Sequence, residues 1–352
     1  MNSIAEPLIR YFKDAATLWN RFWFQPQPAH TLAVIRILGG LMLLYTQLVW
    51  TLDLNAFLGA DSLVSRETSM LLNQGPPTTS SLDSGPIYVW SYLWGIESPL
   101  LLWTLHLLSL AVCLMLTVGL YTRVVSVLAF AITLSYCHRL VGSQFGLDQV
   151  NTMIAMYLMV GPCGAVFSVD RWLANRRGLP PAVVSPWTTV AIRLLQLHMC
   201  IIYLFGGIGK MRGVMWWDGS AVWYAIANLE YQSLDITWLV HYPWLIALLT
   251  HITVFWETFY CFLVWPRVTR PICLAIAVAV HGGIGLFLGM PTFGLAMIIG
   301  NLAFINPATV NWVIDSVSSR FPRTATEPVA APETMRSTRR GASGPSLARF
   351  TE

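Results

Sequence analysis

The sequence predicts an all-α protein, a polytopic bundle of about eight transmembrane helices with interfacial amphipathic helices beside it. Hydrophobic residues make up 55% of the 352 residues, and Asp, Glu, Lys and Arg together make up 11%. An ordinary soluble domain carries about 25% of these charged residues. The chain also has 16 tryptophans and repeated apolar runs of membrane-crossing length. Such a composition excludes a soluble enzyme, a disordered chain and a collagen-like or coiled-coil rod.

The charge balance and the cysteines restrict the partners that we expect. There are 21 basic and 17 acidic residues, a net charge of +4, and no dense basic stripe, so we expect no nucleic-acid partner. The six cysteines are widely separated and form no CxxC pair. We therefore expect neither a disulfide framework nor a metal site, and we interpret the cysteines as small apolar residues packed between helices.

Residues 1–30 precede the first long apolar run. They contain no short apolar core followed by a small-residue cleavage site, so we expect no signal peptide. Apolar residues alternate there with Arg10, Lys13, Asp14 and Arg21. This pattern is typical of an amphipathic helix that lies at the membrane surface.

Eight apolar runs are candidates for spanning helices. They cover residues 31–50, 100–120, 124–138, 148–167, 187–210, 243–265, 271–289 and 292–305. The third and the eighth are short, because a helix of that length, at ~1.5 Å per residue, covers about 22 Å of a hydrocarbon layer of roughly 30 Å. The eighth follows Gly289-Met290-Pro291, so a re-entrant segment is its alternative.

The charges in the loops favour one orientation. With eight spans and a cytoplasmic N-terminus, the inner segments hold 15 Lys and Arg residues and the outer segments hold 4, whereas seven spans give 9 inside and 10 outside. The positive-inside rule favours the first arrangement. We therefore expect a multi-pass protein of the bacterial cytoplasmic membrane with both termini in the cytoplasm.

This arrangement divides the chain into three parts. A transmembrane domain of residues 31–306 follows the interfacial segment of residues 1–30. Residues 307–352 form an amphipathic turn and a basic C-terminal tail, whose Pro, Ala, Ser and Thr content predicts disorder. Two longer outer segments, 51–97 and 210–242, interrupt the transmembrane domain, and the second is rich in Trp and Tyr, as in an interfacial aromatic belt.

The fifth apolar run carries a polar stripe. At about 100° per residue, its larger polar groups fall on one helix face. The stripe consists of Arg193, Gln196, Cys200, Tyr203, Gly207 and Lys210. Because polar groups are costly in lipid, this face should turn toward protein or a cavity, and a polar seam between helices is its structural alternative.

Depth along the helices groups the remaining charges. Arg36, Arg193 and Glu257 fall roughly 7–12 Å from the inner ends of their runs. We predict that Glu257 pairs with Arg193, with Arg36 nearby, in a structural charge network that holds the bundle together. A separation of more than about 8 Å between the two side chains would exclude this pair.

Lys210, His251, His281 and Asp148 fall instead in the outer half of the bundle. Burial disfavours the charged form of a lysine, and a neutral lysine is a base. We therefore predict that Lys210 is a catalytic base at the mouth of a cavity, with His281 and His251 as partners that stabilise a developing oxyanion. The alternatives are a lysine that reaches toward water and histidines in interhelical hydrogen bonds. The candidate substrate-binding residues are Asp148, Gln196, Tyr203 and Trp217.

Several short motifs occur in a distinctive order. They are Arg36-Ile37-Leu38-Gly39-Gly40, Leu147-Asp148-Gln149-Val150, Gly161-Pro162-Cys163-Gly164, Ser168-Val169-Asp170, Arg193-Leu194-Leu195-Gln196, Gly206-Gly207-Ile208-Gly209-Lys210 and Trp217-Asp218-Gly219-Ser220-Ala221. Together they resemble the HTTM family, the membrane domain related to vitamin K-dependent gamma-carboxylase. The resemblance covers about residues 28–306.

The resemblance implies a chemistry. In the carboxylases this domain binds reduced vitamin K, a lysine deprotonates the hydroquinone, and the base that forms after oxygen addition removes a proton from glutamate. That lysine corresponds to Lys210, and the implied cofactor is a reduced quinone. This chain departs from the carboxylases in having Gly209 beside Lys210 where they have a second lysine. It also has no large domain after residue 306, so we do not expect gamma-carboxylation of a protein.

The sequence leaves two hypotheses about function. In the first, an outer-facing cavity that is accessible to a lipid or quinone supports carboxylase-like proton abstraction. In the second, the protein is a non-enzymatic membrane factor for the export or maturation of a small secreted peptide, with segments 51–97 and 210–242 as the contact surface. A transporter is less favoured, since no paired broken helices occur in matching halves. The lipid bilayer is a partner in every case.

Overall fold

The computed structural model describes residues 2–74, 89–180 and 184–319. Within these ranges the chain is helical, and no strand forms apart from an isolated bridge between Gln27 and Ser185. The predicted all-α class is therefore confirmed. Contacts group residues 1–312 into one unit and residues 313–352 into another. The predicted disorder of the tail concerns residues that lie mostly outside the described ranges.

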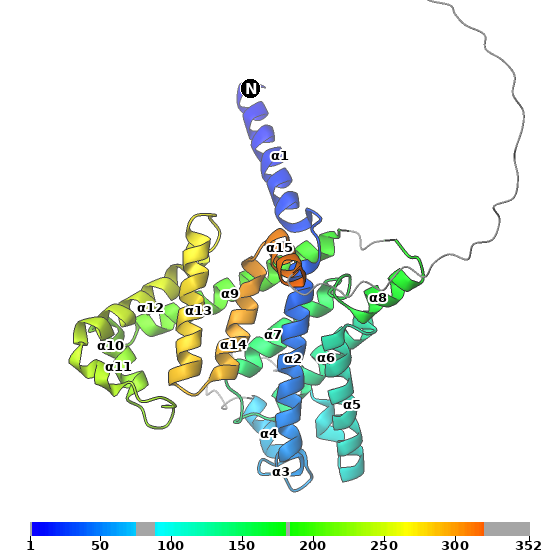
Figure 1. The fold of residues 1–352 in the computed structure, drawn as a ribbon, viewed down its shortest axis with the longest axis vertical. Coiled ribbons are helices and arrows are strands. Elements are labelled where there is room, and N and C mark those ends of the chain that lie inside the picture. The colour runs from blue at the N-terminus through cyan, green and yellow to red at the C-terminus, as the bar shows by residue number, and fades with distance from the viewer. Residues whose placement is uncertain (1, 75–88, 181–183, 320–352) are drawn as a thin grey trace, which may run out of the picture. The chain divides into compact units, whose positions relative to one another are not determined.

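Each predicted apolar run contains a helix (Figure 1). The helices that coincide with these runs are α2 (His30–Leu52), α5 (Pro99–Val118), α6 (Thr122–Arg139), α7 (Gly146–Val160), α9 (Pro186–Met211), α12 (Pro243–Leu263), α13 (Thr269–Phe287) and α14 (Pro291–Asn301), which η3 (Leu302–Phe304) extends. The N-terminal segment forms α1 (Asn2–Phe24), as the alternation of charges predicts.

Shorter helices lie between the long ones. They are α3 (Leu54–Leu58), α4 (Arg66–Gln74), η1 (Tyr92–Gly95), α8 (Val169–Arg176), α10 (Val214–Trp217), α11 (Ala221–Ile226), η2 (Thr237–His241) and α15 (Pro307–Ser318). The segment 210–242 is thus a set of short helical turns, with no single long interfacial helix among its described residues.

Eight spans were expected, and fewer described helices than this are long and apolar enough to be spans. Five described helices are long and apolar enough to cross a membrane: α2, α5, α9, α12 and α13. A sixth is reached when the bent pair Pro291–Phe304 and Pro307–Val317 is taken as one span. Helix α7 has 15 residues, about three quarters of a fully spanning helix, which needs roughly 20 residues. An integral multi-pass membrane protein is nevertheless well supported.

Local sequence signals set the ends of the long helices. Ser98 caps α5 by accepting a hydrogen bond from the backbone N–H of Leu101, and Pro99 occupies the first helical turn. The same helix ends at Gly119, whose φ of 78° lies in the left-handed region that glycine adopts without strain. Ser185 and Pro186 begin α9 in the same way.

Glycines determine where the helices cross. A Cβ at Gly207 of α9 would lie 2.6 Å from the backbone nitrogen of Thr258 in α12, and one at Gly40 of α2 would lie 3.0 Å from the Cα of Thr117 in α5. At Gly294 of α14 it would lie 2.3 Å from a carbonyl oxygen of α13, beside which α14 runs (Figure 1). Small residues let helix backbones approach closely in membranes. The α9–α12 crossing therefore brings the end of α9 to the last third of α12.

Candidate functional site

The centre of the site is an ion pair between two helices. Lys210 lies in the last turn of α9 and Glu257 lies on α12, and the distance from Nζ to Oε2 is 2.6 Å. The side chain of Glu257 is 9% exposed and that of Lys210 is 30% exposed. Among the described residues this is one of two ion pairs, and the other, Arg66 with Glu97, involves a carboxylate that is 80% exposed. The buried carboxylate of the bundle is thus held by the lysine.

The predicted pair of Arg193 with Glu257 is wrong. Residue counts along each run placed Lys210 and Glu257 in opposite halves of the membrane. This estimate assumes parallel helices of equal depth. The contact of Gly207 with the backbone of Thr258 sets a different register, and Lys210, one turn beyond Gly207, comes to the residue before Thr258.

Arg193 is bound elsewhere. Its Nε donates to the carbonyl oxygen of Phe22 in α1 at 3.2 Å, its Nη1 donates to Oε1 of Gln196 at 2.8 Å, and its guanidinium lies 4.4 Å from the centre of the Phe22 ring. Gln196 in turn donates to the carbonyl oxygen of Ala303 at 2.8 Å. Arg193 and Gln196 therefore join α1 and η3 to α9, and neither belongs to the lysine site.

Arg36 is also separate, so the three-residue charge network does not form. Its side chain is fully buried, and its Nη2 donates to the carbonyl oxygen of Phe167 at 2.5 Å. Its Nε and Nη1 have no hydrogen-bond partner in the described part of the chain. Gly119 allows this packing, because a Cβ there would lie 2.0 Å from Nη1.

A chain of hydrogen bonds runs beside the ion pair, from α12 through α14 and α9 to α13. Tyr260 donates to Oδ1 of Asn301 at 2.6 Å, Nδ2 of Asn301 donates to the hydroxyl of Tyr203 at 2.8 Å, and that hydroxyl lies 2.8 Å from Nε2 of His281. All four side chains are less than 5% exposed. Sequence reasoning did not single out Asn301, although an amide within an apolar run is a signal that could have identified it.

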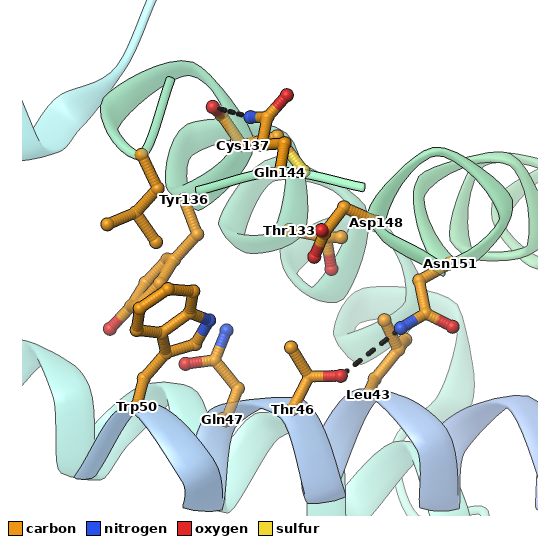
Figure 2. A pocket seen from close by; sticks show the side chains of 11 residues that line it. Leu43, Thr46, Gln47, Trp50, Thr133, Tyr136, Cys137, Gln144, Asp148 and Asn151 are labelled. Atoms are coloured by element: carbon orange, nitrogen blue, oxygen red, sulfur yellow. Dashed lines mark hydrogen bonds between the residues drawn. The ribbon is translucent and has the colours of Figure 1, made fainter. Parts of the chain in front are cut away.

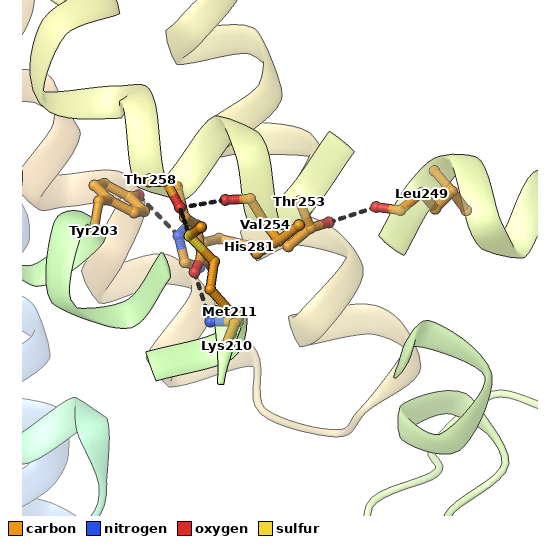
Figure 3. A network of polar contacts seen from close by, with 9 residues as sticks. Tyr203, Lys210, Met211, Leu249, Thr253, Val254, Thr258 and His281 are labelled. Atoms are coloured by element: carbon orange, nitrogen blue, oxygen red, sulfur yellow. Dashed lines mark hydrogen bonds and ion pairs between the residues drawn. The ribbon is translucent and has the colours of Figure 1, made fainter. Parts of the chain in front are cut away.

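The ion pair and this chain are close to each other. Lys210 lies within electrostatic range of His281, and Glu257 lies within range of Tyr203. Figure 3 shows Lys210, Tyr203 and His281 in one network of polar contacts. The structure therefore brings together Lys210, His281 and Tyr203 of the predicted site and adds Glu257, which the sequence analysis assigned to another group.

The direction of the hydrogen bonds follows from the donors that are present. The hydroxyl of Tyr203 already accepts from Asn301, so it can give its own proton to Nε2 of His281. The proton of a neutral His281 ring is then on Nδ1. Nδ1 is buried and has no hydrogen-bond partner in the ranges that the structure describes. With Tyr203 as the donor to Nε2, His281 ends the chain with an N–H at Nδ1 that has no partner among the described residues.

His251 and Trp217 form a different contact. Nδ1 of His251 lies 2.8 Å from the carbonyl oxygen of Ala247, one turn earlier on α12, and Nε2 lies 3.2 Å from the carbonyl oxygen of Trp217. The indole of Trp217 donates to the carbonyl oxygen of Met211 at 2.6 Å. These contacts hold the turn after α9 against α12, which is a structural role.

The motif that follows Trp217 is a turn. The backbone N–H and the hydroxyl of Ser220 both donate to Oδ1 of Asp218, at 2.9 Å and 2.5 Å. These hydrogen bonds hold the pKa of Asp218 below its ordinary value. Gly219 between them has a φ of 83°. Asp218 therefore shapes the chain and contributes no carboxylate to the ion pair.

Asp148 lines a separate small cavity of about 20 Å³ between α2, α6 and α7, which has room for about one water molecule. Figure 2 shows the side chains of Gln47, Asp148 and Asn151 around it. Asp148 accepts a hydrogen bond from the backbone N–H of Phe145 at 3.0 Å, which caps α7. Oε1 of Gln47 and Oδ1 of Asn151 are buried without a partner among the described residues.

Lys210 does not line this cavity. It also lines neither of two others, one between the start of α2 and the first half of α9 and one around Gly161 and Cys163. Its surroundings are open at one side. A Cβ at Gly206 would lie 3.4 Å from Oε2 of Glu257 and 3.9 Å from Nζ of Lys210, and one at Gly209 would meet no atom within 4 Å. Gly206 thus places no side chain against the pair, and the space beside Gly209 is open.

The chemistry available at this site is proton transfer. Within the described ranges, no group of three or more His, Cys, Asp or Glu residues could hold a metal ion. All six cysteines are free, and burial is a sufficient account of Cys113, Cys163, Cys200 and Cys273. The groups that remain are an amine, a carboxylate, an imidazole and phenols.

This fold and site define a class of protein: an all-α, multi-pass membrane protein with charged groups between its helices. The HTTM domain model matches residues 89–312. The protein is therefore a member of the HTTM family. The match begins just before α5 and includes Lys210, Glu257 and His281, whereas α2 with Arg36 lies before it. No curated protein and no solved structure shows a significant match.

Proposed function

We propose that this HTTM protein transfers a proton between the Lys210–Glu257 pair and a lipid-soluble substrate with an acidic hydroxyl group. The observation that carries the proposal is the 2.6 Å contact of Nζ with Oε2, on two candidate membrane-spanning helices. Ionisable groups inside a membrane domain are expensive and mark functional sites.

The pair accepts a proton as a unit. With an ammonium and a carboxylate in contact, the proton from the substrate goes to the carboxylate of Glu257, and the ammonium of Lys210 remains beside the anion that is left. With an amine and a carboxylic acid, the amine takes the proton, and the final state is the same. Because Nζ and Oε2 are 2.6 Å apart, a proton can pass between them, so the base is the pair.

His281 supports the same step. Its Nδ1–H donor is buried and without a described partner, and such a donor stabilises an oxyanion that approaches it. The hydrogen bonds through Tyr203, Asn301 and Tyr260 fix the ring and polarise it, because each donor in the chain strengthens the next. His281 would thus be the polarising residue of the site. His251, with both ring nitrogens at backbone carbonyls, is left out of the proposed machinery.

The residues present fit a reduced quinone in their chemistry. A hydroquinone supplies an acidic hydroxyl, and the base pair and the free Nδ1–H match a hydroxyl and the anion derived from it. Gly206 places no side chain against the pair, and Lys210 is 30% exposed, so a lipid-soluble molecule could approach the pair beside this glycine. The resemblance to vitamin K-dependent gamma-carboxylase points to the same substrate class. Protein carboxylation itself is not part of the proposal.

The test uses the purified protein in nanodiscs with vitamin K1 hydroquinone as the probe. Absorbance reports the ionisation of the bound hydroquinone as a function of pH. We expect the wild type to ionise the probe at lower pH than empty nanodiscs do, and Lys210→Ala and Glu257→Gln to lose this shift. Arg212→Ala is the matched control, because Arg212 is exposed two residues beyond Lys210.

A folded Lys210→Ala protein that ionises the probe as the wild type does would contradict the proposal. Mass spectrometry of co-purifying lipids and quinones gives a second readout. Equal quinone content in the wild type and in Lys210→Ala, together with no ionisation shift in either, would instead favour the non-enzymatic role in peptide export.

A further inference from the structure

A second polar cavity lies at the opposite end of α9. Its volume is about 160 Å³, and it is bounded by the start of α2, the first half of α9, the end of η3, Trp265 after α12 and the start of α13. Thirteen described residues line it, among them Arg193 and Arg270, and none of the thirteen is Asp or Glu. The proposed function makes no use of this cavity.

Each guanidinium keeps one terminal nitrogen free of the hydrogen bonds that fix it. Arg193 uses Nε and Nη1 for Phe22 and Gln196, which leaves Nη2. Arg270 uses Nε for the carbonyl oxygen of Val264 and Nη2 for that of Trp265, which leaves Nη1. The bound nitrogens hold both planes in place, so the free ones are preorganised donors.

The two charges repel each other in this position. Arg193 and Arg270 lie within electrostatic range of one another and line the same cavity. An arginine keeps its charge in proteins, so loss of a proton cannot relieve the repulsion. An oxyanion that accepts a hydrogen bond from each guanidinium removes it, and guanidinium–phosphate hydrogen bonds are among the strongest in proteins.

We infer that this cavity binds a phosphate group through Arg193 and Arg270. The phosphate is the headgroup of an anionic phospholipid or a soluble phosphate compound. The neighbouring helix α1, whose carbonyl at Phe22 holds Arg193, has the alternation of charged and apolar residues of a surface helix. A phosphate at these helix ends would lie at headgroup depth.

The test measures the binding of two probes to the full-length protein. The first is phosphatidylglycerol in phosphatidylcholine nanodiscs, read by native mass spectrometry as retained lipid. The second is inorganic phosphate added to delipidated protein in detergent, read by the thermal melting point. Arg270→Gln is compared with Arg267→Gln, since Arg267 is exposed on the connection just before α13 and lines no part of the cavity.

We expect Arg270→Gln to bind about tenfold more weakly than the wild type and Arg267→Gln to bind equally well, and Arg270→Lys to be intermediate. If the variants differ in this order only with phosphatidylglycerol, the cavity is a lipid site. If they differ in this order with inorganic phosphate, it is a site for soluble phosphate. If Arg270→Gln does not fold, the wild type alone decides the test. Its retention of phosphatidylglycerol over phosphatidylcholine and the rise of its melting point with phosphate are then the two readouts. Equal binding by Arg270→Gln and Arg267→Gln, or a wild type with neither preference, overturns the inference.

Discussion

Lys210 and Arg36 are both cations inside the helical bundle, and the structure holds them in different ways. Lys210 contacts the carboxylate of Glu257 at 2.6 Å and remains 30% exposed. Arg36 is fully buried, is outside ion-pair distance of the described carboxylates, and donates to the backbone carbonyl of Phe167. Two of its nitrogens have no hydrogen-bond partner in the described ranges.

The difference separates a cation that can exchange a proton from one that cannot. A backbone carbonyl is a fixed acceptor that never titrates, and an arginine keeps its proton, so Arg36 fixes the connection between α7 and α8. A lysine in contact with a carboxylate can pass a proton to it. A partly exposed lysine can also reach a substrate. Buried charge alone therefore does not identify a reactive site, but the partner of the charge does.

The largest expected effect tests the packing around Arg36. In Gly119→Ala the new Cβ would lie 2.0 Å from Nη1 of Arg36, at a φ of 78° that alanine rarely adopts. We expect a loss of about 3 kcal/mol or more in the free energy of unfolding. Unfolding by SDS in mixed micelles measures it. Gly209→Ala is the control, since its Cβ meets no atom within 4 Å, and equal stability of the two variants would show that Arg36 is not packed as described.

A slightly smaller effect is expected where α9 crosses α12. Gly207→Ala places a Cβ 2.6 Å from the backbone nitrogen of Thr258, whereas Gly206→Ala places one no closer than 3.4 Å to any atom. We expect the first to lose about 2–3 kcal/mol in the same unfolding assay. The second should be unchanged or more stable by up to about 1 kcal/mol, because alanine is the better helix former. A reversed order would contradict the α9–α12 register.

The coupling of the ion pair comes next in size. Lys210→Met leaves a buried carboxylate without its partner, and we expect a loss of about 2 kcal/mol in the free energy of unfolding. The double variant Lys210→Met with Glu257→Gln should recover at least half of it, because no unpaired charge remains. A double-mutant cycle measures the coupling. Strictly additive losses would mean that the two residues do not interact.

The smallest effect concerns the hydrogen bonds beside the pair. Tyr203→Phe removes the hydroxyl that joins Asn301 to His281 and should lower the free energy of unfolding by about 1–2 kcal/mol. Tyr157→Phe is the matched control, since the hydroxyl of Tyr157 contacts His198 at 2.9 Å in a half-buried position. We expect a smaller loss there. An equal or larger loss in the control would count against a special role for the buried chain.

The sequence predicted the helices well and their contacts poorly. Apolar run length and the caps before Pro99 and Pro186 determine where helices begin, and these signals are local. The register of α9 on α12 depends on Gly207 meeting the backbone of Thr258, a contact between residues 51 positions apart. Depth estimates assume equal, parallel helices, which led to the incorrect partner for Glu257.

Only part of the candidate site was predicted, because local patterns within one helix are easier to read than contacts between helices. The polar stripe on α9 correctly placed Tyr203 and Lys210 on a protein-facing side, since periodicity is read within one helix. It also included Gln196, which instead bonds Ala303. Asp148 was grouped with Lys210 by depth alone, but it faces a different cavity. Depth along a helix gives the position of a residue along the membrane normal. Which residues lie beside it depends on how the helices pack, which depth does not give.

The most direct test of the account is the distance between the two charged groups in a lipid bilayer. Solid-state NMR can measure the distance from ¹⁵Nζ of Lys210 to the ¹³C carboxyl of Glu257. The Arg212→Ala variant, labelled in the same way, is the control in which the pair stays intact. We predict a separation below about 4 Å, as in a direct ion pair. A separation above about 6 Å would contradict it, because the pair could then neither share a proton nor act as one base.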